Sequence, residues 1–479
     1  FFKQKTAYEG YWRDWSSDVC SSDLEGNRII GKVTVERYIP QHYKAWQFLA
    51  APAKGQTIKD AWQEGNVTLG NTQAGYGTII TSNVPSAISQ GFDIQTPGSS
   101  FKQYDAATNT WLNVPSTIQP IENTSAYMLF VRGDRSVTAS NQTSTATTLR
   151  VTGNLYTPVD NPPSPVQVLA NKFEAIGNPY ASAIDFSKLN KSGGIQDAFY
   201  VWDPLLTNTV NGNYGFGAYQ TFVGLGDGNY RVIPGGGSYG DPGTLQRGYI
   251  QSGQAFFVRS VAEAGGIQFE ESAKVGGSAI VTRSSSVRNA ALSINLSYLP
   301  NGNNPVLVDG TLIEIDPSFA STLDAHDISK ILNTSENIST ICQGVALVND
   351  RRSLMNTEDT IWLSVGQLRS RNYRLDIVPS FFDLQGREAR LYDAYTQTYT
   401  TINPSQKTTF DFSVSNAQSA NSSRFCIVLS ADRSTLPVKI TQLSATRKSA
   451  DVLLSWNTEQ EIMVEKYVIE KSVDGHRFF

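Results

Sequence analysis

The sequence has few of the residues that most often carry chemistry in enzymes and metal sites. Its 479 residues include only three histidines and three cysteines. Acyl transfer by a side-chain nucleophile needs a base, most often histidine, within hydrogen-bond reach. His42, His326 and His476 lie in no recognisable nucleophile or metal motif. Two carboxylates would suffice for glycoside hydrolysis, but no pair is singled out. We therefore expect a protein that is not an enzyme.

Long apolar runs and clustered positive charge are also missing. No window of about 18 consecutive apolar residues is present, so no helix of this sequence is expected to cross a membrane. The formal net charge is −4. Nucleic-acid binding depends on a clustered basic face. The sequence therefore predicts neither a transmembrane segment nor a nucleic-acid partner.

The first 24 residues do not resemble protein-coding sequence. FKQKTAYE, residues 2–9, and DWSSDVCSSDL, residues 14–24, match the two parts of a translated sequencing adapter in the correct order. Segments of this kind are excluded from fold reasoning. We expect residues 1–24 to be an unstructured, non-native leader and the native protein to begin near Glu25.

Without Cys20 of this leader, two cysteines remain, Cys342 and Cys426. They are too few for a disulfide framework and lack metal-ligand spacing. Cys426 lies in the apolar run RFCIVLS, where a buried free thiol is the simpler interpretation. A single bridge between the two cysteines is the alternative.

Glycine, serine, threonine and asparagine separate short apolar runs along most of the chain. Charged residues make up 17%, below the roughly 25% typical of soluble proteins. The runs recur about every 8 to 12 residues between turn residues, which is typical of β-sandwiches and barrels. We therefore predict an all-β protein of several consecutive sandwich or barrel-like domains.

Changes in composition divide the native part into four segments. Residues 25–160 form a first β domain, which ends at the proline-rich stretch VDNPPSPVQ because each proline removes a ladder donor. Residues 168–275 form a β-meander with glycine-rich and aromatic loops. A Gly/Ser-rich join leads to a β-sandwich at 288–433. Residues 437–479 form a fourth segment, in which the sequence pattern changes again.

Several strands can be located by their period of two. Phe410, Phe412 and Val414 alternate with polar residues in TTFDFSVS, and Ile361, Leu363 and Val365 share one face of DTIWLSVG. FKQYDAATNTWLNV, residues 101–114, predicts a hairpin with its turn at DAATN.

Two short helices interrupt this β pattern. In TIKDAWQEG, Thr57 can cap a helical turn and Gly65 can end it. DAHDISKIL, residues 324–332, predicts the second helix.

The last segment carries the clearest family likeness. Val452, Leu454 and Trp456 alternate along one strand, Tyr467 and Ile469 along the next, and the pair at 474–475 is a hairpin turn signal. The LPV start, the strand ending in Trp, TEQEI and YVIEKSVDG resemble the fibronectin-type-III-like module of type IX secretion system cargo. In that family the module precedes a C-terminal sorting domain, which this sequence does not include. About half of a seven-stranded sandwich is present, so we expect an incomplete fibronectin-type-III-like domain.

Upstream segments also resemble large bacterial surface proteins of this family, among them GKVTVERYIP, AYMLFVRGDRS, IGNPYASAIDF, YVWDP and RLYDAYTQTYTTI. The resemblance implies export across the outer membrane and a location outside the cell or on its surface. It implies no shared catalytic activity.

An aromatic cluster in the second segment is the candidate ligand site. It consists of Trp202, Tyr214, Phe216, Tyr219 and Tyr230. Flat aromatic faces can stack on the apolar faces of sugar rings at a concave surface. The alternative is that these residues form cross-strand pairs in the core.

Three other patterns have a functional and a plain interpretation. Asp203, Asp227 and Asp241 could supply oxygen ligands to a structural calcium ion, although their spacing matches no EF-hand; ordinary turns are the alternative. Arg132-Gly133-Asp134 invites an adhesion interpretation, but a Gly-Asp pair after a strand is ordinary hairpin chemistry. The glycine-rich stretches near 224–243 lack the context of a phosphate loop. No cofactor is expected apart from such calcium.

These observations favour a secreted or cell-surface protein with an adhesin-like or structural role, whose β domains present loops to glycans or to surface proteins. The alternative is that they are accessory, carbohydrate-binding modules of a secreted hydrolase whose catalytic domain lies upstream.

Overall fold

The computed structural model describes most of the chain beyond the leader. The described residues are 31–41, 43–65, 73–96, 98–157, 164–207, 214–239, 245–275, 289–300, 304–353, 359–382, 387–431, 439–459, 467–469 and 472. Within them lie strands β1 to β30, one α-helix and three short 3-10 turns. The all-β prediction is confirmed. The adapter-like residues 1–24 lie outside the described residues.

The first segment packs two small antiparallel sheets face to face. One has the order β1-β7-β3, with β1 at Val33–Ile39, β7 at Thr147–Leu155 and β3 at Ala53–Lys54. The other has the order β2-β6-β4-β5, with β2 at Ala45–Leu49, β6 at Tyr127–Val131, β4 at Phe101–Asp105 and β5 at Thr110–Asn113. Leu49, Leu129 and Val151 lie in the core between them. The predicted hairpin at 101–114 is β4 and β5.

Helix α1, Ile58–Trp62, is built as the sequence predicts. The backbone N–H of Asp60 donates to the Thr57 hydroxyl at 3.1 Å, which caps the first turn. Gly65 has a φ of 72°, and its N–H donates to the carbonyl of Lys59 at 2.8 Å. This left-handed glycine closes the last turn.

The second segment is dominated by one sheet. Its strands run in the order β11-β17-β12-β13-β14-β15, with β8 and β9 also paired to β17. Their bounds are β8 Val166–Val168, β9 Phe173–Gly177, β11 Asn190–Ile195, β12 Ala198–Asp203, β13 Ala218–Gly224, β14 Asn229–Ile233, β15 Leu245–Arg247 and β17 Ala255–Gln268. A small sheet pairs β10, Ile184–Asp185, with β16, Tyr249–Ile250. Every residue of β12, β13 and β14 is buried, because both faces of these strands are covered.

The third segment forms a single sheet of 11 strands that curls into a nearly closed, barrel-like layer. The bounds are β18 Ala290–Tyr298, β19 Val306–Ile315, β20 Ile328–Ser329, β21 Asn337–Cys342, β22 Val345–Arg352, β23 Asp359–Gly366, β24 Asn372–Ser380, β25 Arg387–Asp393, β26 Thr398–Thr401, β27 Thr408–Ser413 and β28 Phe425–Ala431. Phe412 of β27 contacts Phe425 of β28 with ring centroids 4.9 Å apart, although several strands separate them in the sheet order. The strands expected to form a two-sheet sandwich therefore lie in one curled sheet around one core.

The predicted alternations in this segment are confirmed. Ile361, Leu363 and Val365 of β23 point into the core, and so do Phe412 and Val414 at the end of β27. Cys342 and Cys426 are both buried free thiols. Strand β23 lies between the strands that carry them, so the alternative of a bridge is not realised.

The predicted second helix is wrong. Residues 324–327 form a turn, in which His326 N–H donates to Asp324 Oδ1 at 2.8 Å and Asp324 N–H donates to Asp327 Oδ2 at 3.0 Å. Strand β20 follows and pairs with β22, and Tyr200 of the second segment donates to the carbonyl of Ser329. Side-chain turn bonds and a tertiary contact thus outweigh the helical pattern.

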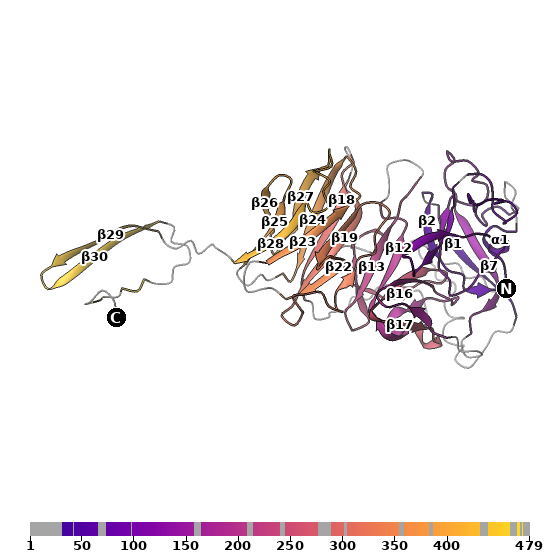
Figure 1. The fold of residues 1–479 in the computed structure, drawn as a ribbon, viewed down its shortest axis with the longest axis horizontal. Coiled ribbons are helices and arrows are strands. Elements are labelled where there is room, and N and C mark those ends of the chain that lie inside the picture. Colours follow the sequence, from indigo (N-terminus) through magenta and orange to yellow (C-terminus); the bar gives the residue numbers. More distant parts are fainter. Residues whose placement is uncertain are drawn as a thin grey trace, which may run out of the picture.

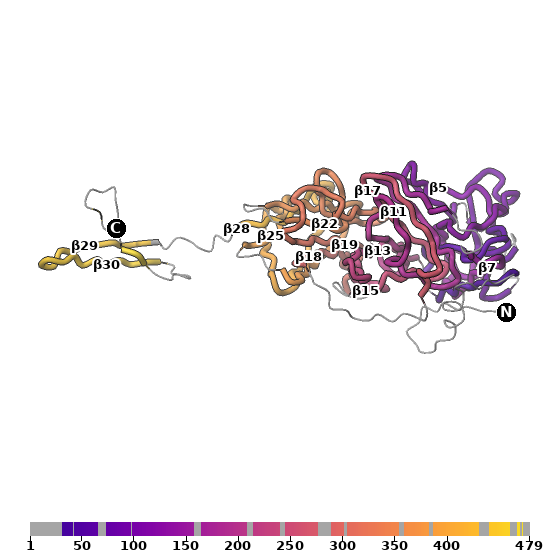
Figure 2. Tube along the Cα trace, turned by 90° about the horizontal axis from the view of Figure 1, so that it is seen from below, coloured from indigo at the N-terminus to yellow at the C-terminus, as the bar shows by residue number. Residues whose placement is uncertain are grey.

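Figure 1 shows the three segments following one another along the molecule, from indigo through magenta to orange. The tube view of Figure 2, turned by 90°, shows the same sequence of layers. A shared core cluster joins them, with Phe48 from the first, Tyr200 from the second and Leu312 from the third. The segments therefore pack as one body in the structure.

The last segment contains a hairpin of β29, Lys439–Lys448, and β30, Asp451–Glu459. Leu454 and Trp456 alternate with exposed residues along β30 as predicted, whereas Val452 is itself exposed. Trp456 contacts Tyr467 with ring centroids 5.7 Å apart. Residues 467–469 carry no strand, and the turn signal at 474–475 lies outside the described residues.

Candidate functional site

Three of the five residues in the predicted aromatic cluster belong to the core. Trp202 on β12 lies directly opposite Tyr219 on β13, with ring centroids 4.8 Å apart and both side chains buried. Tyr230 is 1% exposed and donates its hydroxyl to Asp197 Oδ1 at 2.9 Å. The prediction of one sugar-binding platform from the five is therefore wrong, because strands covered on both faces leave these rings no free face.

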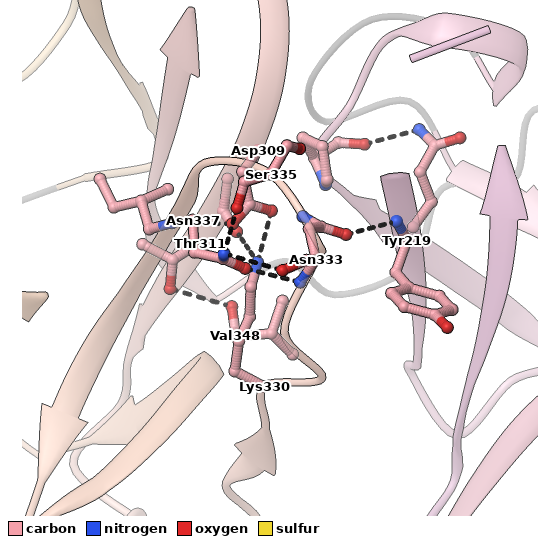
Figure 3. A network of polar contacts seen from close by, with 12 residues as sticks. Tyr219, Asp309, Thr311, Lys330, Asn333, Ser335, Asn337 and Val348 are labelled. Atoms are coloured by element: carbon pink, nitrogen blue, oxygen red, sulfur yellow. Dashed lines mark hydrogen bonds and ion pairs between the residues drawn. The ribbon is translucent and has the colours of Figure 1, made fainter. Parts of the chain in front are cut away.

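Tyr219 also ties the second segment to the third. Its backbone N–H donates to Asn333 Oδ1 at 2.8 Å, and Asn333 N–H donates to Asn337 Oδ1 at 2.7 Å. Figure 3 shows this network beside the buried ion pair of Lys330 and Asp309, whose Nζ and Oδ1 atoms are 2.6 Å apart. The surroundings of Tyr219 are those of a structural joint.

The predicted calcium ligands do not gather. Asp203 is buried and accepts from the N–H groups of Leu205 and Ser238 at 2.9 and 2.8 Å. Asp227 is exposed and accepts from both the backbone and the side chain of Asn229. The bonds from Leu205 and Asn229 are those of ordinary turns, whereas the bond from Ser238 joins the end of β12 to the segment after β14. Asp241 lies outside the described residues, within which no group of three His, Cys, Asp or Glu side chains could hold a metal ion.

The Arg132-Gly133-Asp134 sequence is not presented as a loop tip. Asp134 is buried, and its carboxylate accepts from Gly75 N–H at 2.7 Å and from the Thr145 hydroxyl at 3.1 Å. Gly133 has a φ of 121° and packs so closely that an added Cβ would lie 2.6 Å from the Thr145 nitrogen. The hydrogen bonds from Gly75 and Thr145 hold the Asp134 carboxylate inside the protein, which agrees with the turn interpretation.

The two remaining aromatic residues of the cluster are exposed, Tyr214 at 39% and Phe216 at 40%. The Arg369 guanidinium lies 5.0 Å from the centre of the Phe216 ring. Tyr214 pairs with Lys44, just before β2, as if it extended the β2-β6-β4-β5 sheet by one more strand. The Tyr214 ring stacks on the Phe130 ring of β6, with ring centroids 6.2 Å apart. Tyr214 therefore belongs to a surface of the first segment.

That surface is the outer half of one face of the β2-β6-β4-β5 sheet. Alternation along β2 places Lys44, Trp46 and Phe48 on the same side. Trp46 lies directly opposite Phe130, with ring centroids 5.4 Å apart. Further along, Phe48 packs on Phe257 of the second segment and is buried. The face is thus covered at one end and half-buried around Trp46 and Phe130 at the other.

A positively charged side chain contacts each of the three rings at this open end. Lys102 Nζ lies 5.2 Å from the Trp46 ring, Arg132 Cζ 5.0 Å from the Phe130 ring and Lys44 Nζ 5.6 Å from the Tyr214 ring. Such contacts contribute about 0.5–1 kcal/mol each at exposed sites. We call these six residues the cation–aromatic face: Lys44, Trp46, Lys102, Phe130, Arg132 and Tyr214.

The electrostatics of the face are unusual. Lys44 is buried and its Nζ donates to the carbonyls of Ala139 and Ser140, both at 3.0 Å. Burial, and then the charge of Arg132, lower the pKa of Lys44. Burial also lowers the pKa of Arg132, although Tyr214 and Asp93 act in the opposite direction. Two like charges therefore converge in a partly dry environment.

The sequence contains a signal for this face in two alternating runs. Lysine or arginine, aromatic and apolar residues alternate as Lys44-Trp46-Phe48 and, in reverse, as Met128-Phe130-Arg132. Because β2 and β6 pair antiparallel, the two patterns lie side by side. About 80 residues separate the two runs along the chain. Each run therefore predicts a strand, but neither predicts that the two strands pair.

The family model of a domain of unknown function, DUF8693, matches residues 66–429. The match covers most of the chain, which therefore belongs to this family. The search of curated proteins and the search of solved structures found no match. No helix in the described part of the chain is long and apolar enough to cross a membrane.

Proposed function

We propose that this chain is part of a secreted or cell-surface bacterial protein that binds glycans without catalysing a reaction, through the cation–aromatic face. The observation that carries the proposal is the set of three rings, each contacted by its own cation, at the open end of a sheet. The resemblance to type IX secretion system cargo supports a place outside the cell or on its surface.

The chemistry of the face suits sugars. Ring edges and faces offer apolar contact to the C–H groups of a pyranose, while ammonium and guanidinium groups donate hydrogen bonds to its oxygens. Trp46 and Phe130 are held by the paired strands β2 and β6, so little ordering of these two rings is needed when a ligand binds. An accessory module of a secreted hydrolase would use the same face, and a catalytic domain encoded in the same gene would distinguish the two roles.

A glycan array probed with the full chain tests the proposal. Tyr214→Ala and Phe130→Ala are expected to lose most of the binding, because each removes one ring and the contact to its cation. Phe216→Ala is the matched control, since this ring has the same exposure but lies outside the face. Thermal unfolding of each variant shows whether the fold is retained. Absence of binding to any glycan, or equal loss in the Phe216 variant, would refute glycan recognition at this face.

The expected location has its own test. Antibodies against the full chain should label intact cells of the source bacterium or precipitate the protein from the culture medium. Recovery of the protein only from the cell interior would contradict the export part of the proposal.

A further inference from the structure

We infer that the glycan bound by the cation–aromatic face is anionic and that its carboxylate or sulfate group lies against Lys102 and Arg132. The inference rests on the proposed function and adds the charge class of the ligand.

Buried cations elsewhere in the described structure are neutralised by carboxylates. Arg135 pairs with Asp93 at 2.7 Å, Lys330 with Asp309 at 2.6 Å, and Arg424 with Asp393 at 2.7 Å. All six side chains are almost fully buried. Burial of an unpaired charge is costly, so a nearby carboxylate is the usual arrangement.

The cation–aromatic face departs from this arrangement. Lys44 is as buried as the paired lysine Lys330, yet its ammonium group is met by two carbonyl oxygens. Arg132 donates to the Ile79 carbonyl at 3.4 Å and to the Thr96 hydroxyl at 3.1 Å. In the part of the chain that the structure describes, neither side chain nor Lys102 forms a salt bridge. The face therefore keeps an excess of positive charge.

Lys44 and Arg132 also occupy neighbouring positions. The register pairs Ala45 with Val131, so the next position on each strand brings these two cations to the same side of the sheet. Burial lowers the pKa of Lys44, and the repulsion between the two cations lowers it further. An anion placed nearby would relieve it, whereas a neutral sugar would not.

The three cations have different tasks at such a site. Lys102 and Arg132 are half-buried and can reach a ligand, while Lys44 lies beneath Tyr214 and acts through its field. The aromatic rings hold the ammonium and guanidinium groups in place, so less side-chain freedom is lost when they donate to an anion. The rings thus orient the cations in addition to contacting the sugar.

The net charge of the whole chain cannot explain binding of an anionic glycan. The whole chain has a formal net charge of −4. Long-range forces therefore oppose the approach of a polyanion, and attraction must come from a local cluster. Binding at the cluster should weaken as salt is added.

Isothermal titration calorimetry with the full chain tests the inference. The ligands are an oligogalacturonate and its fully methyl-esterified form, which share one backbone and differ in charge, together with dextran sulfate and dextran. We expect one anionic member of a pair to bind at least about tenfold more tightly than its neutral partner, a factor that corresponds to about 1.4 kcal/mol. Which pair responds distinguishes a carboxylate from a sulfate ligand.

Two lysine variants locate the contact. Lys102→Gln removes one charge from a side chain that forms no salt bridge with the described residues. It should weaken anion binding about fivefold to tenfold, as expected for one charge-assisted hydrogen bond. Lys188→Gln removes the same charge from an exposed lysine of the second segment and should leave binding unchanged.

The outcomes separate this inference from the proposed function. Equal binding of charged and neutral glycans, lost in Tyr214→Ala, overturns the anionic ligand but retains glycan recognition. Anion binding that falls equally in both lysine variants overturns the local site and indicates diffuse adsorption. Absence of binding to every glycan overturns both.

Discussion

Glu174 is expected to make the stability of this protein depend on pH. It lies on β9 of the second segment, near Asp105 at the end of β4 in the first, and its Oε1 accepts from the Ala175 N–H at 3.2 Å. Burial, helped by the negative charge of Asp105 and opposed by the hydrogen bond from Ala175, raises the pKa of Glu174 to about 7. The variant Glu174→Gln keeps an acceptor oxygen and cannot ionise.

The sign follows from the raised pKa. An unfolded glutamate ionises near its ordinary value of 4.5, whereas the folded one stays protonated up to about 7. The unfolded state therefore releases its proton first, and stability falls between about pH 4.5 and 7. At about 1.36 kcal/mol per pKa unit the upper bound is about 3 kcal/mol. Because the carboxyl is partly solvated, screening reduces this to about 1–2 kcal/mol.

Urea unfolding followed by tryptophan fluorescence measures the effect. At pH 8 the variant should be more stable than the natural protein by about 1–2 kcal/mol, and at pH 4 the two should agree closely. Glu122→Gln, at an exposed position of the first segment, is the control and should show no such change with pH. A gain for Glu174→Gln that is the same at both pH values would refute the assignment to ionisation.

Three further predictions concern the core, a buried ion pair and a helix cap. Trp202→Ala should destabilise the protein by about 3–5 kcal/mol, because the ring is buried against Tyr219, and calorimetric melting should show this whatever happens to ligand binding. Lys330→Met should cost about 3–5 kcal/mol in urea unfolding by leaving the buried Asp309 without its cation, and a second change, Asp309→Leu, should recover part of the loss. Thr57→Ala should cost about 1 kcal/mol by removing the cap of α1, whereas an unchanged midpoint would contradict that role.

The sequence predicts this fold well where strands have one dry face. Ile361, Leu363 and Val365 alternate with outward residues in β23, so their period of two is visible without the structure. Strands β12 to β14 are covered on both faces, and the alternation that separates core from surface is lost there. That loss is why Trp202 and Tyr230 could be taken for a binding platform. Which strands pair over long distances is also hidden, because each run carries no record of its neighbour.

The candidate site was predicted only in part. Tyr214 belonged to the predicted cluster, and its exposure and nearby charges fit a ligand surface. Its neighbours Lys44, just before β2, and Phe130, on β6, belong to the first segment. The sequence does not indicate them because it does not show which strands pair. The wrongly predicted helix at 324–332 has a similar cause. Tyr200 of the second segment donates a hydrogen bond to Ser329 of β20, and the local sequence does not reveal this contact.

The position of the cation–aromatic face bears on where the functional unit begins. The family match starts at residue 66 and includes Lys102, Phe130, Arg132 and Tyr214. Strands β1 and β2 precede it, yet β1 pairs with β7 and β2 with β6, so they complete both sheets of the first segment. Lys44 and Trp46 lie in this preceding stretch. A fragment cut at residue 66 would expose β6 as an edge, lose one ring and one cation of the face, and leave Tyr214 without the strand beside which it lies. The smallest unit that can test ligand binding therefore includes β1 and β2 as well as the region shared by the family.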